Sequence, residues 1–510
     1  MGEEKKEEGK EAVSRRKYLG AVGGLAAAAV VGWGVAGYLA SKPPAPAIEK
    51  TVTETKTITV TPAVTPTGFD WSKVGKQFSG ETVTILVESG TRMDKWLDII
   101  RHDWRNLTGI NIEIVSLAFS QMGEAAMTDF LAGTGAYDIV YMVNFWGGLM
   151  AIGDHFYPIE DLIKEYPDLH DPSFVPENFV EKHMDLVAYW DVKKKVNGRP
   201  GKLTLMSCFP DGQHFFYRKD LFNDPNEKKE FEAQYGHELT VPKTWKEVHE
   251  IAEFFTRPKQ GIYGIVFDGT LDDAASDFWV RFLTEGGQIW KYADGKWPPD
   301  NFTPNLDSKE AVQALEYLVE EIKWAPPGVL GYGQVEASDA FITKDIAQAS
   351  FWFAYGGKSM DPKVSKIVDK VGFAVNPGKR PGRGILGGWG AGVSRYSKHK
   401  PAAFLTIEYL LSEEVNKKQV LEGYMSPARA KLYHDPDITG TRPYVPIQLA
   451  TLEASESHHI NFTTVSFELL THIVEEGTAC LSGAKDPETA ANAIQERWIT
   501  SLKREGYKVD

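Results

Sequence analysis

The chain has 510 residues, with 70 Asp and Glu against 56 Lys and Arg, so its formal net charge at pH 7 is −14. Its 42% hydrophobic and 25% charged residues are typical of a globular protein and exclude a disordered or fibrous chain. The acidic balance argues against a general nucleic-acid binder, which needs a basic surface to neutralise phosphates. The two cysteines, Cys208 and Cys480, exclude a disulfide-dense scaffold and leave open whether they pair with each other.

The first residues carry the pattern of an export signal. Arg15 and Arg16 precede Tyr18 and Leu19, an arrangement that resembles the twin-arginine export motif. An uncharged apolar run over residues 19–40 follows. It is longer than the ~7–15 residues of a secretory signal and close to the ~20 residues of a membrane-spanning helix. We therefore predict an exported protein on the extracellular face of the cell membrane, anchored there through a signal segment over residues 1–41.

Residues 42–79 are rich in Thr and Pro. This composition cannot bury a core, and it favours an extended, semi-rigid chain. We predict a stalk linker that holds the following domain away from the membrane. Because the chain has a single long apolar run, it cannot be a multi-span channel or transporter.

From about residue 80 the chain alternates between strand and helix patterns. Residues 82–87 and 110–115 are β-branched runs, and residues 137–143 are nearly continuously apolar, as in a strand covered on both faces. Residues 94–107 and 120–131 lie between these runs and have helical spacing. Such alternation is typical of parallel βαβ units.

The same alternation returns later in the chain. Thr244 and Glu247 form a capping box that opens a helix ending before Pro258, and residues 261–267 have the pattern of another strand. Further helices are expected over residues 307–322, 401–411 and 490–502. No period of about 20–50 residues repeats, which excludes a solenoid or a propeller.

Motifs for nucleotide binding and metal binding are incomplete. Gly382, Gly384 and Gly387 satisfy the letters of a dinucleotide fingerprint but lack its strand-turn-helix context. His249 opens a zincin-like helix, but Glu253 stands where the second metal-ligating histidine belongs. We therefore predict no catalytic residue, no metal and no cofactor. A glycosidase pair among the many carboxylates stays open as an alternative.

Four tryptophans stand in or beside Gly-rich or polar segments: Trp146, Trp279, Trp352 and Trp389. A tryptophan flanked by glycines is poorly suited to core packing, because its neighbours supply no side chains to hold it. An indole ring is suited to stacking on the apolar face of a sugar, whose hydroxyls pair with Asp, Asn, Gln or Arg. In an exported protein, these residues indicate a carbohydrate-binding site.

Several short segments along the chain, some of which contain these tryptophans, form a recognisable series. In order, they are YDIV (137–140), NFW (144–146), YPIEDL (157–162), FPDGQ (209–213), FYRKDLF (216–222), PKTW (242–245), EGG (285–287), WF (352–353) and GGWGAGVS (387–394). Taken together they resemble the extracellular solute-binding proteins of ABC sugar importers (family 1), similar to maltose-, trehalose- and glycerol-phosphate-binding proteins. The most specific part of the resemblance is the pairing of FYRKDLF with PKTW.

The resemblance implies an α/β, two-lobe, periplasmic-binding-protein-like (class II) fold, with a hinge and an interlobe ligand cleft. The strand that ends at Asp211 would be the first crossing between the lobes, and residues 371–377 the second. Ligand would stabilise the closed state by hinge closure. The implied boundaries are residues 80–208 and 373–425 for the first lobe, and residues 209–372 and 426–510 for the second.

The resemblance also implies which aromatic and amide side chains line the cleft. Asn144 and Trp146, after the YDIV strand, would be cleft residues of the first lobe. Asn144 stands where several relatives carry Asp. Trp352 and Trp389 would stack on the ligand from opposite walls, and Trp279 is a further candidate.

The remaining ligand-binding residues implied by the resemblance are polar. Asp211 at the crossing would be the acidic acceptor of ligand hydroxyls, with Gln213 close to it. Glu88, after the first strand, would be another hydroxyl partner. Arg429 follows a position where relatives place a polar cleft residue.

The predicted function is that of a receptor, not an enzyme. It would capture a mono- or oligosaccharide and deliver it to the permease subunits of an ABC transporter, as a monomer and without nucleic acid. The alternatives are a surface-anchored carbohydrate-hydrolysing enzyme, or a binding protein for a peptide or phosphate ester. A phosphorylated ligand would require a cluster of Arg or Lys, and Arg429 is the only basic residue among the predicted ligand-binding residues.

Overall fold

The computed structural model describes residues 69–510 except 90–91, 192–195, 198–200, 272–273, 293–298, 424 and 456–462. The twin-arginine motif, the apolar run and the Thr/Pro-rich segment up to residue 67 lie outside these described residues, and the signal, anchor and stalk stay predictions. Within the described ranges, no helix is both long enough and apolar enough to span a membrane.

The strands and helices follow the predicted alternation. The strands are β1 (Thr82–Glu88), β2 (Asn111–Leu117), β3 (Ile139–Val143), β4 (Phe156–Tyr157), β5 (Tyr189–Asp191), β6 (Val196–Asn197), β7 (Lys202–Leu203), β8 (Met206–Arg218), β9 (Ile262–Val266), β10 (Asp345–Trp352), β11 (Val371–Ala374) and β12 (Leu386–Ser394). The 3-10 turns are η1 (Lys76–Phe78), η2 (Asn144–Trp146), η3 (Pro167–Leu169), η4 (Pro176–Asn178), η5 (Pro258–Gln260), η6 (Ile322–Trp324), η7 (Val329–Gly331) and η8 (Ala430–His434).

The helices are α2 (Trp71–Gly75), α3 (Arg92–Thr108), α4 (Phe119–Ala132), α5 (Gly147–Met150), α6 (Ile159–Glu165), α7 (Glu181–Val187), α8 (Lys219–Asn223), α9 (Pro225–Tyr235), α10 (Trp245–Phe255), α11 (Ser276–Thr284), α12 (Lys309–Glu321), α13 (Gln334–Thr343), α14 (Ala354–Ser359), α15 (Lys400–Leu410), α16 (Glu413–Gly423), α17 (Pro436–Thr439), α18 (Val445–Ala454), α19 (Ser466–Leu481) and α20 (Pro487–Arg504). Each strand and helix predicted from periodicity is therefore confirmed, with its ends within a few residues.

The folded body begins at Phe69, before the expected boundary at residue 80. Helix α2 packs against α3 and α15 through Trp71, whose ring lies 6.2 Å from that of Trp104 and 5.6 Å from that of Tyr409. Gly75 lies so close to Thr108 that a Cβ there would come within 2.3 Å of its methyl group. This short helix is therefore part of the body rather than of a linker.

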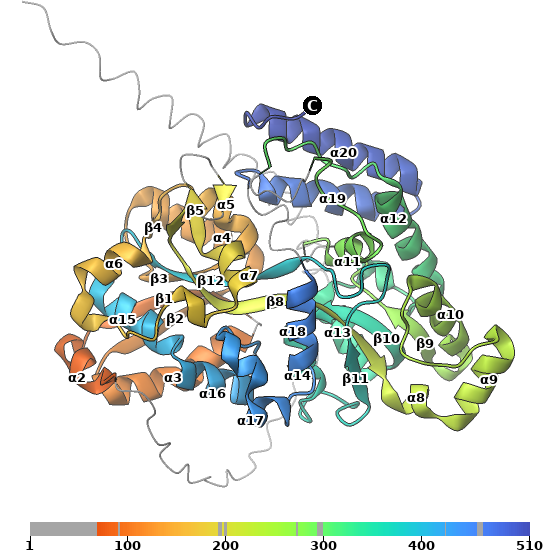
Figure 1. The fold of residues 1–510 in the computed structure, drawn as a ribbon, viewed down its shortest axis with the longest axis horizontal. Helices are drawn as coiled ribbons and strands as arrows, with labels where there is room; N and C mark the ends of the chain where they lie inside the picture. The colour runs from red at the N-terminus through yellow and green to blue at the C-terminus, as the bar shows by residue number, and fades with distance from the viewer. Residues whose placement is uncertain are drawn as a thin grey trace, which may run out of the picture. The chain divides into compact units, whose positions relative to one another are not determined.

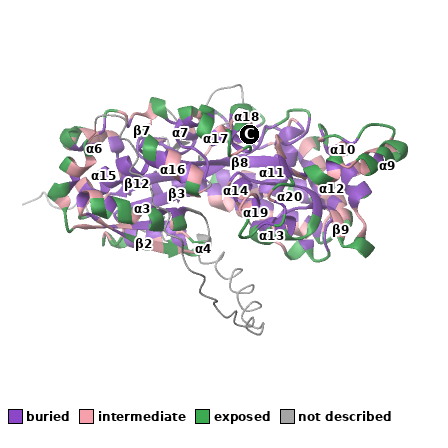
Figure 2. Ribbon diagram, turned by 90° about the horizontal axis from the view of Figure 1, so that it is seen from below, coloured by how far each residue is buried: buried purple, intermediate pink, exposed green. Residues whose placement is uncertain are grey.

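The first lobe is built on parallel strands. β1 pairs in parallel with β2 and β3, and β12 adds to β3 in the antiparallel sense. The sheet order is β2-β1-β3-β12-β8-β10-β9, and strands β5, β6 and β7 form a separate small sheet. β3 and β12 are wholly buried, as expected for strands covered on both faces, and most of β1 is buried. Figure 2 shows β3 and β12 in the buried interior, with helices around them that have exposed residues.

Strand β8 belongs to both lobes. Its first half pairs with β12, and its second half pairs with β10 and β11 (Figure 1). The strand therefore continues beyond Asp211, where the sequence placed its end, because residues 213–218 find new partner strands. β8 is the first crossing between the lobes.

The second lobe gathers β9, β10 and β11 with helices α8 to α14 and with the C-terminal pair α19 and α20. Helix α10 begins at the predicted capping box, where Thr244 accepts a hydrogen bond from Glu247 N, and Glu247 in turn accepts from Lys243 N. Its apolar face packs with Phe215 and Val280 into a buried cluster beneath the sheet. α19 and α20 pack on each other and on α12.

Two further connections link the lobes. One runs from β11 to β12, and the other passes from α16 through α17 and α18 to α19. They meet at Ser455, whose hydroxyl donates to Gly382 O and accepts from Gly384 N. Helix α18 contacts β8 on the way. Residues 428–429, expected in the second lobe, pair with residues 179–180 of the first.

Candidate functional site

Three predicted site residues meet where β3 ends beside β12. Trp389 on β12 lies opposite Val143 on β3, and Asn144 and Trp146 follow directly in η2. The indole of Trp146 meets that of Trp389 edge to face, with ring centroids 6.1 Å apart. Asn144 Nδ2 donates to Leu386 O at 3.4 Å. The topology of the sheet thus brings these three residues together.

The neighbouring strand β8 adds two more predicted residues. Asp211 and Gln213 are two positions apart on β8, so their side chains lie on one face. Gln213 pairs in register with Trp352 on β10, and Gly387 pairs with Asp211. A Cβ on Gly387 would come within 2.8 Å of the Trp352 ring, so the missing side chain allows this indole to lie over the crossing.

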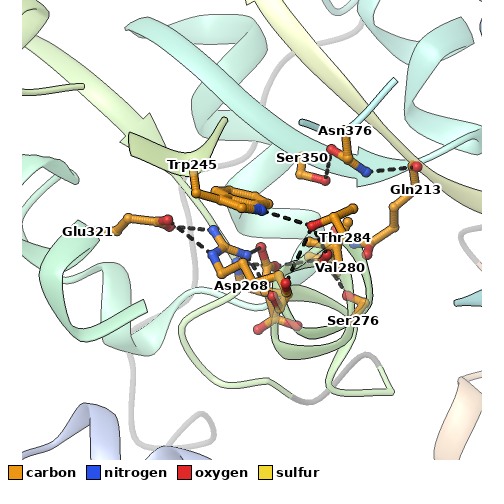
Figure 3. A network of polar contacts seen from close by, with 12 residues as sticks. Gln213, Trp245, Asp268, Ser276, Val280, Thr284, Glu321, Ser350 and Asn376 are labelled. Carbon is orange, nitrogen blue, oxygen red and sulfur yellow. Dashed lines mark hydrogen bonds and ion pairs between the residues drawn. The ribbon is translucent and has the colours of Figure 1, made fainter. Parts of the chain in front are cut away.

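The backbone at this crossing is held by Asn376. Its Nδ2 donates to Gln213 O at 2.9 Å, and its Oδ1 accepts from the Ser350 hydroxyl at 2.9 Å (Figure 3). Asn376 is buried and lies just after β11, on the second connection between the lobes. It therefore ties that connection to β8 and β10 beside the candidate site.

Two acidic side chains, Asp211 and Glu88, belong to the candidate site. Asp211 Oδ1 accepts hydrogen bonds from Gly212 N and Phe353 N, both at 2.9 Å. Burial nevertheless raises the pKa of Asp211 to about 8. Burial, together with the charges of Asp94 and Asp211, also raises the pKa of Glu88 to about 8, which places Glu88 within electrostatic reach of Asp211.

Several polar atoms of this cluster are buried and have no hydrogen-bond partner among the residues that the structure describes. They are Asn144 Oδ1, Gln213 Oε1 and Nε2, and Trp352 Nε1. Buried polar groups are almost always paired, because an unpaired one costs about 1–3 kcal/mol. A ligand rich in hydroxyls would supply these partners. We call Glu88, Asn144, Trp146, Asp211, Gln213, Trp352 and Trp389 the crossing cluster.

The structure places Trp279 and Arg429 in packing positions. Trp279, on α11, is fully buried, and its ring lies 5.9 Å from Phe282 and 6.1 Å from Trp498. Arg429 is buried with its guanidinium 4.2 Å from the Phe179 ring centroid, and its Nε donates to Leu411 O. These contacts are those of core side chains.

One candidate residue was not predicted. Tyr433, on η8, is buried, its hydroxyl has no partner among the described residues, and the nearby Asp211 charge acts with burial to raise its pKa. Its neighbours in the sequence form no ligand-binding motif.

The metal-ligating side chains and the two cysteines were also compared with the predictions. Among the described residues, no three His, Cys, Asp or Glu side chains are grouped so as to hold a metal ion. Cys208 and Cys480 are both buried and free, so the disulfide left open by the sequence does not form.

The raised pKa of Asp211 predicts how stability depends on pH. Between its unfolded value of about 3.9 and its folded value of about 8, the folded state keeps a proton that the unfolded chain releases. Stability of the ligand-free protein should therefore fall as pH rises through this range. Asp211→Asn should be the more stable form at pH 8, by about 1–2 kcal/mol, with a smaller difference at pH 4. Urea unfolding at pH 4, 6 and 8 measures this, and a pH-independent difference would contradict it.

Comparison with known proteins places the chain in a family. Residues 88–417 match the family model for bacterial extracellular solute-binding proteins. A probable amino-acid ABC transporter periplasmic-binding protein of Sinorhizobium fredii is 24% identical over 439 residues, covering 85% of this chain and 92% of the relative. A mannitol-binding protein of Pseudomonas aeruginosa is 23% identical over 329 residues, covering 60% and 71%.

A solved structure has the same fold. The ABC transporter solute-binding protein of Agrobacterium radiobacter K84, in complex with ribitol, superposes with a TM-score of 0.67 at 23% identity, covering 82% of this chain and 98% of the other. The two-lobe fold predicted from the resemblance is thereby confirmed. With a family model that matches most of its length, the chain belongs to the bacterial extracellular solute-binding proteins.

Proposed function

We propose that the protein is the receptor of an ABC importer, and that it binds a carbohydrate or polyol at the crossing cluster. The observation that carries this proposal is a buried set of amide and indole groups, on Asn144, Gln213 and Trp352, that have no hydrogen-bond partner among the described residues and lie in the same cluster as the indoles of Trp146 and Trp389. Such groups can satisfy the hydroxyls of a ligand, while the indoles cover its apolar face.

The crossing cluster favours a neutral ligand over an anionic one, because it contains no basic side chain that could pair with an anion. Its acidic members are Asp211 and Glu88, and the hydrogen bonds given for Asp211 all come from backbone N–H groups. The carboxylate of an amino acid or the phosphate of an ester would approach these acids without a compensating cation. The mannitol and ribitol named for two relatives are neutral polyols, which suits this arrangement.

The finer parts of the proposal concern location and partners. The protein would be exported by its twin-arginine segment, held at the extracellular face of the membrane by residues 1–41, and would act as a monomer. It would pass its ligand intact to the permease subunits. The family consists of binding proteins, which supports a receptor over the hydrolase alternative.

A thermal-shift screen of the full-length protein tests the ligand class. We expect D-mannitol, ribitol or maltose at 1 mM to raise the unfolding midpoint by several degrees, because a ligand at ~100 times its Kd stabilises the native state by about 2.7 kcal/mol. Glutamate, a short peptide and glycerol 3-phosphate are the comparison ligands. A shift with these alone would contradict the proposal.

The same samples distinguish between a receptor and a carbohydrate-hydrolysing enzyme. Maltose incubated with the protein should be recovered intact, without released glucose. Steady release of glucose that scales with protein concentration would instead favour the hydrolase.

A further inference from the structure

Helix α4 carries a glycine on its buried face. Four buried residues follow the i, i+3, i+4, i+7 spacing of one helix face: Gly123, Ala126, Met127 and Phe130. Glycine is less favourable inside a helix than any other residue except proline. Gly123 does not have a positive φ, so the local backbone does not require it. The reason for a glycine at this position therefore lies in a tertiary contact.

That contact is with the indole of Trp146. A Cβ on Gly123 would come within 3.2 Å of Trp146 Cε2 and Cζ2, and within 3.6 Å of Cδ2. All three atoms belong to the six-membered ring of the indole. Carbon atoms in ordinary contact lie about 3.5–4.0 Å apart, so a methyl group on residue 123 and the indole could not both keep their present places. The indole thus occupies the space that a side chain of residue 123 would fill.

Trp146 joins α4 to the rest of the crossing cluster. Its ring also meets the ring of Trp389 edge to face, with centroids 6.1 Å apart. It lies on η2, which helix α19 of the second lobe contacts. The position of this indole relative to Trp389 therefore depends on how closely it approaches α4.

A second indole of the cluster lies against a glycine in the same way. A Cβ on Gly387 would come within 2.8 Å of the Trp352 ring. Gly123 is on α4 and Gly387 is on β12, so each glycine belongs to a different element from its indole. Two indoles of one cluster are thus placed by missing side chains, which links these glycines to the site.

We propose that Gly123 is a positioning residue of the ligand site. Because it has no side chain, the Trp146 indole lies back against α4 and leaves space beside Trp389 for the apolar face of a sugar or polyol. A methyl group on residue 123 would move the indole away from α4 by a few tenths of an ångström. Dispersion contacts weaken steeply with such shifts, so the ligand would fit the indole less well. This inference rests on the carbohydrate or polyol ligand proposed above.

Gly123→Ala in the full-length protein tests this assignment, with D-mannitol, ribitol and maltose as probes. We expect Kd for the probe that binds the wild-type protein to rise about 2- to 10-fold, as when one aromatic contact is weakened. The unfolding midpoint without ligand should not fall, because alanine favours the helix. An unchanged Kd would overturn the assignment, whatever the midpoint.

Gly423→Ala is the matched control. Gly423 also lies in a helix of the first lobe, α16, and faces an indole, but its Cβ would lie at an ordinary distance of 3.7 Å from the Trp96 ring. Trp96 is buried and is not part of the crossing cluster. This variant should leave Kd unchanged.

Trp146→Phe tests whether the effect passes through the indole. The phenyl ring is smaller than the indole, so it leaves room for the added methyl group. In the Trp146→Phe background, Gly123→Ala should change Kd by less than twofold. If the effects of the two substitutions are fully additive, Gly123 does not act through Trp146 and the assignment is wrong.

Fluorine NMR of the protein labelled with 5-fluorotryptophan gives a readout that needs no ligand. The Trp146 signal, identified by its loss in Trp146→Phe, should shift in Gly123→Ala and keep its position in Gly423→Ala. A Trp146 signal that does not move would contradict the assignment even if Kd rises. If the wild-type protein binds none of the three probes, the proposed ligand class is wrong and the assignment fails with it. A probe that binds wild type and Gly123→Ala equally refutes only the role of Gly123.

Discussion

Arg281→Met should lower the free energy of unfolding by about 3–5 kcal/mol, the effect expected when one partner of a buried ion network is removed. Arg281, Asp277 and Glu321 are at most 1% exposed. Arg281 donates to Asp277 Oδ1 at 2.9 Å and to Glu321 Oε1 at 3.0 Å, and its second Glu321 contact is shorter still. Without the guanidinium, two carboxylates would be left in the core without their cation.

The network has further connections that a substitution would disturb. The Arg281 guanidinium lies 4.6 Å from the ring centroid of Trp245, whose Nε1 donates to Thr284 Oγ1 at 2.8 Å. His249 Nε2 lies 3.2 Å from the same Glu321 oxygen. The charge of Arg281 helps keep the pKa of Glu321 below its ordinary value despite burial. Removing Arg281 should therefore weaken the packing of α10, α11 and α12 together.

Urea unfolding at pH 7 measures this effect, and Arg504→Met is the matched control. Arg504 also forms an ion pair with a glutamate, Glu468, but its side chain is 54% exposed. Exposed pairs contribute only about 0–1 kcal/mol. If the two variants lost the same free energy of unfolding, burial of the Arg281 network would not increase its contribution to stability.

Local structure was predictable because it depends on near neighbours in the sequence. The capping box at Thr244 and the periodicity after it were enough to place α10. The extent of β8 could not be predicted in this way, because its second half pairs with β10 and β11, which follow more than a hundred residues later in the sequence. Likewise, the sequence around α2 has the composition of a linker, and the contacts that fix this helix to the body, with Trp104 and Tyr409, are distant in sequence.

The site was predictable only in part, for a similar reason. Asn144, Trp146 and Trp389 follow strand patterns, and neighbouring strands bring them together. Trp279 had the same polar surroundings in the sequence, but its helix turns it toward Trp498 in the core. Tyr433 had no local pattern at all. Sequence context gives the residue type and the element, whereas the direction of the side chain depends on the fold.

Gln213→Leu should change stability and affinity in opposite directions. Gln213 is fully buried, and within the described part of the chain neither end of its side-chain amide has a partner. An apolar side chain of similar volume removes two unsatisfied groups, so the ligand-free protein should gain about 1–2 kcal/mol of stability. If the amide bonds to ligand hydroxyls, the same change should weaken binding about tenfold to a hundredfold.

Gln348→Leu provides the matched control for this prediction. Gln348 is equally buried on the neighbouring strand β10, but its Nε2 donates to Val248 O at 2.6 Å, and only its Oε1 has no partner among the described residues. Its replacement breaks one bond within the protein and removes one unsatisfied oxygen, so stability should change by less than about 1 kcal/mol and Kd should stay unchanged. Isothermal titration with the probe that binds the wild-type protein, together with urea unfolding, measures both quantities. If Gln213→Leu loses stability and keeps its affinity, Gln213 is a structural residue and the crossing cluster must bind its ligand without it.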